Sequence, residues 1–262
     1  MNILIIGKPF DDIVCLVKAS KYTEKIYTAL NKGDTEFPNI EYRNFDELIQ
    51  KSIALKIDIA INLEKDLIQK GIAEAFEQSK INLISVNQKW FNLEQSRLSA
   101  KKLLNHYKIN IPKIIQIPLT FPVKLKTDLP GTEYRINSMN ELVSQMEKFK
   151  NQTIFFEEYI EGKPLELYAL WDKENIKYFY DTKTMTEVQI DRLDLLKTKL
   201  NFMFSDEKAD FTGIFAINLI WYKNDWYVDG FDMGAFLPKE LCKTEDFIYV
   251  LNSVIYQKLN EI

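Results

Sequence analysis

The stretch NLEQSRLSAKKLLNHYKINIP, residues 92 to 112, separates two parts of the chain that carry different patterns. Its apolar residues recur at helical spacing, and Asn92 with Gln95 three residues later resembles a capping box. We therefore expect one helix over residues 92 to 109, ended by the Ile-Pro that follows, because proline has no N–H for a further helical turn. Strands and helices alternate before this helix, whereas strands predominate after it.

Residues 1 to 90 alternate between short strands and helices. The runs NILIIG, IDIAIN and KINLISV have the composition of strands. Helical spacing runs through DDIVCLVKASKYTEKIYTAL, and further helices are expected in NFDELIQKSIALK and EKDLIQKGIAEAFEQS. Because strands joined by such helices form right-handed crossovers, this part is predicted to be an α/β domain with a mainly parallel sheet.

The part after the dividing helix favours an α+β arrangement. Helices are expected near residues 140 to 150, near 187 to 203 and in the closing EDFIYVLNSVIYQKLNEI, and a mostly antiparallel sheet accounts for the rest. We divide the chain into a domain over residues 1 to 90 and a second over 91 to 262. Within the second, residues 92 to 109 form a linker helix, about 118 to 158 a small subdomain and about 159 to 262 the remainder. The strand-like runs are PVKLKT, TIFFEEYIEG, LELYALWD, IKYFYDT, FTGIFAINLIWY and WYVDGFD.

Charge and composition narrow the function classes. A net charge of -4 gives no general electrostatic reason to bind nucleic acid or an anionic membrane, so we expect small-molecule or protein partners. The apolar run MNILII is too short for a signal peptide or a membrane span, which makes a cytoplasmic location the default expectation. His106 is the sole histidine, so chemistry must rely on carboxylates, lysines, arginines and backbone groups rather than on a histidine triad.

In its order of segments the chain resembles the ATP-grasp superfamily and, within it, the glycinamide ribonucleotide synthetases, or phosphoribosylamine-glycine ligases. The likeness covers about residues 1 to 240 and is clearest in residues 92 to 112, where that family has a helix bearing a Ser-Lys pair. The resemblance implies a Rossmann-like pre-ATP-grasp domain followed by an ATP-grasp domain. It also implies ATP and Mg²⁺ as cofactors.

Two cations hold the nucleotide phosphates in that family, and the resemblance assigns this role to Arg97, where the family has lysine, and to Lys126. Either side chain can neutralise polyphosphate, arginine as a fork and lysine as a point charge. Without the resemblance, both residues would be read as ordinary solvated charges.

The run FFEEYIEG resembles the hinge whose backbone groups read the edge of adenine. By itself the same run would equally suit a strand that enters a turn. In place of the family's ribose-binding glutamate stands Pro164, and Glu166 is a possible substitute two residues later. The hinge positions are Glu157, Glu158, Tyr159 and Ile160.

The run VDGFDMG, residues 228 to 234, resembles the family's magnesium-bearing strand but departs from it. Gly230 falls on a metal-binding glutamate, Asp232 on an asparagine and Gly234 on an arginine. Asp232 is therefore one candidate ligand for Mg²⁺. Asp229 is a second candidate if the strand shifts by one residue, although such a shift would turn its side chain to the opposite face.

Other departures concern the substrates. GKPFDD after the first strand makes a poor phosphate cradle, because it has one glycine, a proline without an N–H and two carboxylates. The predicted lid TDLPGTEYRIN holds only Gly131, and residues 181 to 211 lack the family's glycine-rich substrate segment. We expect no counterpart of the family's carboxyl-terminal domain.

Two functions stay open on the sequence alone. One is an ATP-dependent carboxylate-amine ligase that acts through an acyl-phosphate on unspecified substrates. The other is a non-catalytic descendant that keeps the fold as a nucleotide-binding or protein-interaction module. The losses just named make glycinamide ribonucleotide synthesis itself the least favoured specific reaction.

Overall fold

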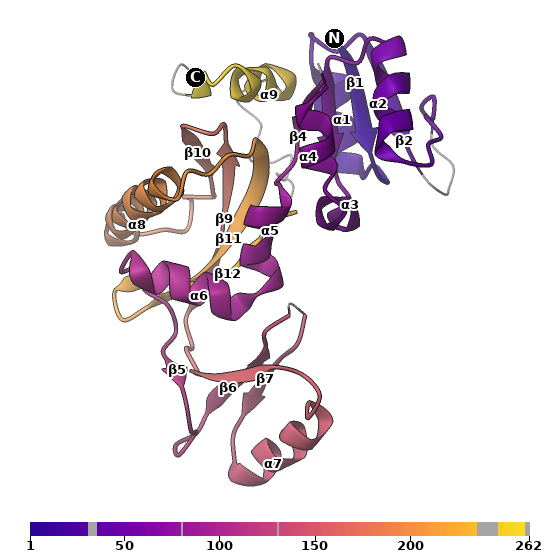
Figure 1. The fold of residues 1–262 in the computed structure, drawn as a ribbon. Coiled ribbons are helices and arrows are strands. Elements are labelled where there is room, and N and C mark those ends of the chain that lie inside the picture. Colours follow the sequence, from indigo (N-terminus) through magenta and orange to yellow (C-terminus); the bar gives the residue numbers. More distant parts are fainter. Residues whose placement is uncertain (31–35, 80, 130, 235–245, 260–262) are drawn as a thin grey trace.

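The structure is a computed structural model that describes residues 1–30, 36–79, 81–129, 131–234 and 246–259. These residues form three four-stranded sheets with helices packed around them. Figure 1 shows the sheets following one another along an elongated molecule, with the amino-terminal sheet at one end and the smallest subdomain, which carries α7, at the other.

The amino-terminal sheet is wholly parallel, in the order β2-β1-β3-β4, which confirms the predicted α/β architecture. Its central strand β1 is NILII, and Ile3 to Ile6 are fully buried. Such burial is expected when helices cover both faces of a parallel sheet. The strands are β1 (Asn2–Ile6), β2 (Lys25–Ala29), β3 (Ile59–Asn62) and β4 (Asn82–Ile84); the helices are α1 (Asp11–Ala19), α2 (Phe45–Ala54), α3 (Lys65–Gln69) and α4 (Ile72–Glu77).

Two helix predictions in this part were wrong in extent. Helical spacing continued through residue 30, but α1 ends at Ala19 and the run KIYTA forms β2 in parallel register with β1. Pairing along the edge of a sheet decides strand formation there, and local spacing does not detect it. Gly71, with φ of 81°, ends one helix and begins the next, so a single predicted helix becomes α3 and α4.

The largest sheet is antiparallel, in the order β10-β9-β11-β12. Alternate residues of β9 point to opposite faces: Leu167, Ala169 and Trp171 enter a core with α8, whereas Glu166 and Tyr168 lie on the other face. Its elements are β9 (Lys163–Trp171), β10 (Ile176–Phe179), β11 (Gly213–Tyr222), β12 (Asp225–Asp232) and α8 (Glu187–Asp206).

The predicted linker helix is interrupted, and this corrects both its extent and its cap. Two helices, α5 (Gln88–Gln95) and α6 (Arg97–His106), replace the single helix 92 to 109. Asn87, not Asn92, caps α5. Ser96 has extended backbone angles, and its hydroxyl accepts a hydrogen bond from the Ser99 N–H. A serine cap of this kind begins a new helix at a new angle.

The small sheet, in the order β5-β8-β6-β7, is also antiparallel, and α7 (Met139–Lys148) packs on it through Leu142. Residues 133 to 136 of the predicted lid are strand β7 and pair with β6, so the lid prediction was wrong for that portion. Residues 159 to 162 lead from β8 into β9 and thus join the two antiparallel sheets. The strands are β5 (Ile114–Ile115), β6 (Val123–Thr127), β7 (Glu133–Ile136) and β8 (Ile154–Glu158).

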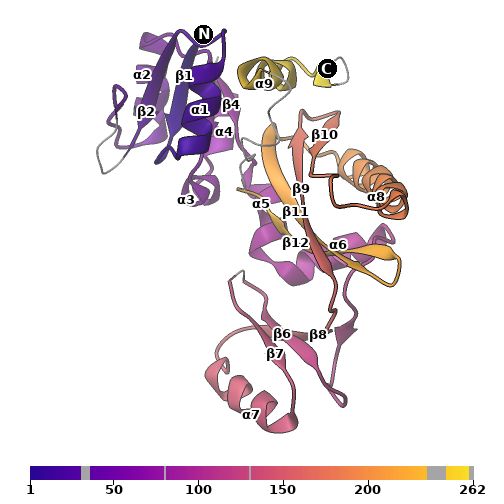
Figure 2. The ribbon, with the colours of Figure 1, turned by 180° about the vertical axis from the view of Figure 1, so that it is seen from behind.

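The last helix, α9 (Phe247–Ile255), returns to the amino-terminal sheet, as Figure 2 shows from behind. Phe247, Leu251 and Val254 share a core with Ile3 and Ile13. The predicted domain boundary near residue 90 stays a prediction. Helix α9, which the sequence analysis placed in the second domain, packs against the amino-terminal sheet. Within the described ranges, every helix is too short or too polar to cross a membrane.

Candidate functional site

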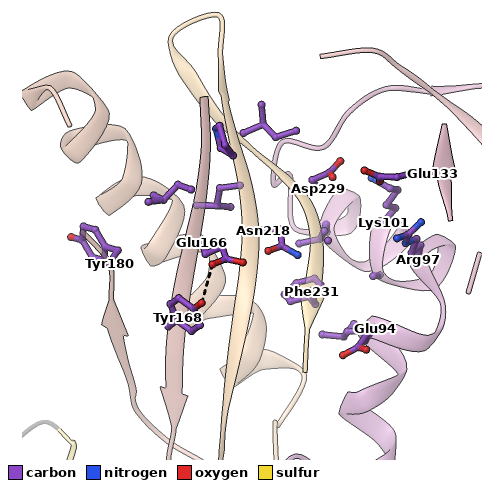
Figure 3. A pocket seen from close by; sticks show the side chains of 18 of the residues that line it. Glu94, Arg97, Lys101, Glu133, Glu166, Tyr168, Tyr180, Asn218, Asp229 and Phe231 are labelled. Carbon is purple, nitrogen blue, oxygen red and sulfur yellow. Dashed lines mark hydrogen bonds between the residues drawn. The ribbon is translucent and has the colours of Figure 1, made fainter. Parts of the chain in front are cut away.

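A cavity of about 1350 Å³ opens where α5 and α6, the small sheet and the large sheet meet. Figure 3 shows side chains of the helices on one side of it and of β9 and β11 on the other. Of the sequence-predicted site residues, four line the cavity and five do not. The four are Arg97, Lys126, Glu166 and Asp229; the five are Glu157, Glu158, Tyr159, Ile160 and Asp232.

Two buried lysines lie at the small-sheet end of the cavity. Lys126 is 1% exposed and Lys101 3% exposed, so the alternative interpretation of Lys126 as a solvated surface charge is excluded. Both contact Glu157, which is fully buried: Lys101 Nζ is ion-paired with Oε1, and Lys126 Nζ lies 3.1 Å from Oε2. Buried charges persist when they are paired in this way, because each would otherwise lose its hydration without compensation.

Asp229 completes this buried cluster because β12 contains a bulge. Asn218 of β11 pairs with Gly230 and Leu219 pairs with Val228, so Asp229 is the extra residue. Its Oδ1 accepts a 2.7 Å hydrogen bond from Lys126 Nζ, and Oδ2 lies 3.6 Å from Lys124 Nζ. The sequence analysis considered a one-residue shift of the whole strand for Asp229. The structure has a local bulge instead, and Asp229 contacts Lys126 there.

The environment shifts the pKa values of this cluster in opposite directions. Burial raises the pKa of Asp229, but Lys126 and Lys124 outweigh it, and the net pKa is lowered. Burial lowers the pKa of Lys126, yet Asp229 and Glu157 outweigh it, so the net pKa is raised. For Lys101 burial dominates, and the pKa is lowered despite Glu157. Lys126 is therefore a firmly fixed cation in the cavity wall.

Arg97 lines the cavity but already binds the loop between β6 and β7. Its Nη1 donates to the carbonyl oxygens of Thr132, at 3.1 Å, and Thr127, at 3.5 Å. The carboxylate of Asp128 accepts hydrogen bonds from the Leu98 N–H and the Ser96 hydroxyl at the start of α6. Arg97 and Asp128 together tie this loop to the amino terminus of α6.

Of the hinge residues, Glu157 pairs with two cavity-lining lysines, whereas the side chains of the three that follow it make other contacts. Glu158 accepts a 3.0 Å hydrogen bond from the Lys113 N–H. The Arg135 guanidinium lies over the Tyr159 ring, 4.4 Å from the ring centroid, and Ile160 is 6% exposed. The role that the resemblance gives to the backbone groups of this segment stays a prediction.

Glu166 lies at the opposite side of the cavity, on β9. Its carboxylate accepts a 2.9 Å hydrogen bond from the hydroxyl of Tyr168, as Figure 3 shows. Burial, together with this bond, raises the pKa of Tyr168 to about 12. Because the Tyr168 hydroxyl keeps its proton, it donates the hydrogen bond and Glu166 accepts it. Glu166 also lines the cavity.

Asp232 does not line the cavity, but it belongs to a second group of charges whose member Glu94 does. Its Oδ1 accepts a 2.8 Å hydrogen bond from Lys65 Nζ, which also donates at 2.9 Å to Glu94 Oε1. Within the described ranges, no group of three or more His, Cys, Asp or Glu residues could hold a metal ion. Because lysines already pair with both candidate aspartates, this donor set does not fit a resident Mg²⁺, which takes oxygen ligands in octahedral geometry.

The sequence interpretation missed Lys101, Lys65 and Glu94. Lys101 follows Arg97 by four residues, so helical spacing could have placed both on one face of α6. No local signal marks Lys65, which comes from α3 of the amino-terminal domain, or Glu94, which the interruption at Ser96 positions.

The architecture and the cavity can be compared with known proteins. No family model matches the chain. A phosphoribosylamine-glycine ligase of Thermotoga maritima has a similar structure, with a TM-score of 0.76 and 14% identity over 98% of this chain and 76% of that chain. The chain has the ATP-grasp fold.

Two further similar proteins agree with this fold. A D-alanine-D-alanine ligase of Bacillus anthracis, solved as a complex with ATP, matches with a TM-score of 0.64 and 16% identity over 100% of this chain and 98% of that chain. By sequence, the chain is 22% identical over 327 residues to a phosphoribosylamine-glycine ligase of Fusobacterium nucleatum, covering 100% of this chain and 75% of the relative. The similarity therefore extends over the whole chain.

Proposed function

We propose that this protein is an ATP-dependent ligase that joins a carboxylate to an amine and binds ATP in the central cavity. The observation that carries the proposal is this cavity of about 1350 Å³ between the two antiparallel sheets of an ATP-grasp fold. It exceeds the volume of about 300 to 1,000 Å³ that is typical of a small-molecule site, so ATP and a second substrate can occupy it together. The similarity of the whole chain to named ligases supports catalysis over a purely structural role.

The charges of the cavity support one orientation of the nucleotide. Lys126 and Arg97, at the small-sheet end, would contact the phosphates, and Glu166 on β9 would accept hydrogen bonds from the ribose hydroxyls. Backbone groups of residues 158 to 160 would read the edge of adenine.

In this function the substrate carboxylate attacks the γ-phosphorus of ATP, which releases ADP and forms an acyl-phosphate. The amine then attacks the acyl carbon, and inorganic phosphate leaves. Lys126 and Arg97 would stabilise the negative charge on the transferred phosphoryl group.

The amine substrate is proposed to carry no phosphate at the loop after β1. Glu64 occupies the space beside Gly7, since a Cβ atom there would lie 2.4 Å from its Cγ. Its Oε1 accepts a 3.4 Å hydrogen bond from the Lys8 N–H, and Asp11 and Asp12 stand in the first turn of α1. A carboxylate already occupies this anion position, so a substrate phosphate would meet repulsion there.

Thermal unfolding with and without Mg-ATP tests the proposal. A ligand that binds only the folded state raises Tm. At a ligand concentration of one hundred times Kd, the free energy of unfolding increases by about 2.7 kcal/mol. Arg97→Gln should remove most of this rise. Its matched control is Lys102→Gln, a solvent-exposed position on the same helix, which should retain it. No rise for the wild type at millimolar nucleotide would contradict ATP binding.

Catalysis needs a separate measurement. We expect hydroxylamine to trap the acyl-phosphate as a hydroxamate when the protein is supplied with ATP and a panel of amino and hydroxy acids. Glu166→Gln should lower hydroxamate formation at limiting ATP because it weakens nucleotide binding, whereas Glu161→Gln, an exposed position just before β9, should not. ATP binding without hydroxamate formation from any acid would favour the non-catalytic alternative.

A further inference from the structure

Lys65 bridges three elements that are far apart in sequence. Lys65 is the first residue of α3, Glu94 lies near the end of α5 and Asp232 ends β12. The Lys65 ammonium lies 2.9 Å from Glu94 Oε1 and 2.8 Å from Asp232 Oδ1. One monovalent cation thus stands between two carboxylates, which is the position a divalent ion would take in a two-carboxylate site.

Both carboxylates are fixed by backbone groups independently of Lys65. Glu94, whose side chain is 8% exposed, accepts a 2.8 Å hydrogen bond from the Met233 N–H through Oε2. Asp232 Oδ1 also accepts one from the Gly234 N–H at 3.2 Å. The pair would therefore remain in place, and would repel each other, if the ammonium were removed.

The chain makes room for the lysine at Gly234. A Cβ atom at this position would lie 2.6 Å from both Cγ and Cε of Lys65, so any side chain here would displace the lysine stem. Gly230 differs, because a Cβ atom there would meet nothing within 4 Å and would point into open space at the cavity. The glycine at 234 is thus coupled to Lys65, whereas the one at 230 leaves the cavity open.

We propose that Lys65 is a built-in cation that replaces a divalent metal between Glu94 and Asp232, so that this site binds nucleotide without a resident metal ion. The other candidate carboxylate, Asp229, is likewise neutralised by Lys126. The nucleotide part of this inference rests on the proposed function, whereas the replacement of the metal by Lys65 stands on the geometry alone.

The first test needs no nucleotide. Wild-type protein should show the same Tm in EDTA, Mg²⁺ and Mn²⁺, and it should bind no Mn²⁺ in equilibrium dialysis. Lys65→Met should gain a metal-dependent rise in Tm, because its two carboxylates then lack a cation. The double variant Lys65→Met with Asp232→Asn should lose that gain. A further Gly230→Glu change in the Lys65→Met protein should enlarge it, since this side chain enters open space.

Specific Mn²⁺ binding by the wild type, or a folded Lys65→Met protein indifferent to metal, would overturn the inference. If Lys65→Met does not fold, equilibrium dialysis of the wild-type protein with Mn²⁺ still tests whether this site holds a metal ion.

The second test compares the Kd of ATP in EDTA with that in Mg²⁺ by calorimetry. We expect the two values to agree within about threefold, less than 1 kcal/mol. Binding that weakens more than about tenfold in EDTA would contradict metal independence. Absence of ATP binding in both buffers would contradict the proposed function, and the metal measurements would still decide whether Lys65 replaces a metal ion.

Discussion

Two lysine-carboxylate clusters border the same cavity region and differ in their exposure to solvent. In the first, Lys101, Lys126 and Glu157 are at most 3% exposed and pair with one another. In the second, the side chains of Lys65 and Asp232 are 40% and 42% exposed, and only that of Glu94 is nearly buried, at 8%. The comparison separates charges that the fold must pair from charges that water also stabilises.

The two clusters should respond differently to the same kind of change. Removing one partner of a buried pair leaves a charge without hydration or compensation, which costs about 3 to 5 kcal/mol. An exposed pair is worth about 0 to 1 kcal/mol, since water and salt screen it. The following predictions run from the largest expected effect to the smallest.

Glu157→Gln should have the largest effect. It leaves Lys101 and Lys126 facing each other without their shared carboxylate, and we expect a loss of about 3 to 5 kcal/mol in the free energy of unfolding in urea. The control is Glu133→Gln, because Glu133 lies 3.7 Å from the same Lys126 Nζ but is 47% exposed. Equal losses for the two variants would remove the distinction between the clusters.

Asp229→Asn should change the dependence of stability on pH. The lysines lower the pKa of the Asp229 carboxyl in the folded protein, so its stabilisation is present above about pH 4 and is lost as the pH falls through the folded value. The variant should be less stable than wild type at pH 7, with the difference narrowing toward pH 3. Parallel unfolding free energies across this range would contradict the assignment.

Lys65→Met should cost less than Glu157→Gln, because Lys65 and Asp232 are half exposed, although Glu94, at 8% exposed, also loses its cation. Unlike the Glu157→Gln loss, this one should shrink as NaCl rises to 1 M, where the screening length falls to about 3 Å. A loss of several kcal/mol that does not depend on salt would place this cluster with the buried one.

Gly234→Ala should have the smallest effect and act only through Lys65. Its methyl group displaces a flexible stem, and the expected loss is about 1 kcal/mol or less. The same change in the Lys65→Met background should cost nothing further if the two positions are coupled. Gly230→Ala, which enters open space, is the matched control and should be neutral.

Local patterns were sufficient for much of the fold. The runs at β1, β3 and β4 and the helices between them indicated the parallel sheet, and the turn at residues 223 to 225 indicated the β11-β12 hairpin. Patterns were insufficient where a segment depends on a distant neighbour. β2 forms through its pairing with β1, and β7 forms through its pairing with β6.

The candidate site also has residues that the sequence indicated and contacts that it did not. The resemblance to the ATP-grasp superfamily indicated Arg97, Lys126 and Glu166, and all three line the cavity. The partners of these residues could not be inferred, because an ion pair depends on which elements meet. The ion pairs Lys126–Asp229 and Lys65–Asp232 join residues that are 103 and 167 positions apart in the sequence.

By itself, the sequence determined the alternation of strands and helices and the change of pattern near residue 92, since periodicity is a local property. The cavity residues Arg97, Lys126 and Glu166 followed from its resemblance to the ATP-grasp superfamily. Only the tertiary structure decided which charges are neutralised. Asp229 and Asp232 lie three residues apart on one strand, their side chains are 18% and 42% exposed, and they bind different lysines. Their capacity to hold a metal depends on these lysines, which the fold brings from β6 and from α3.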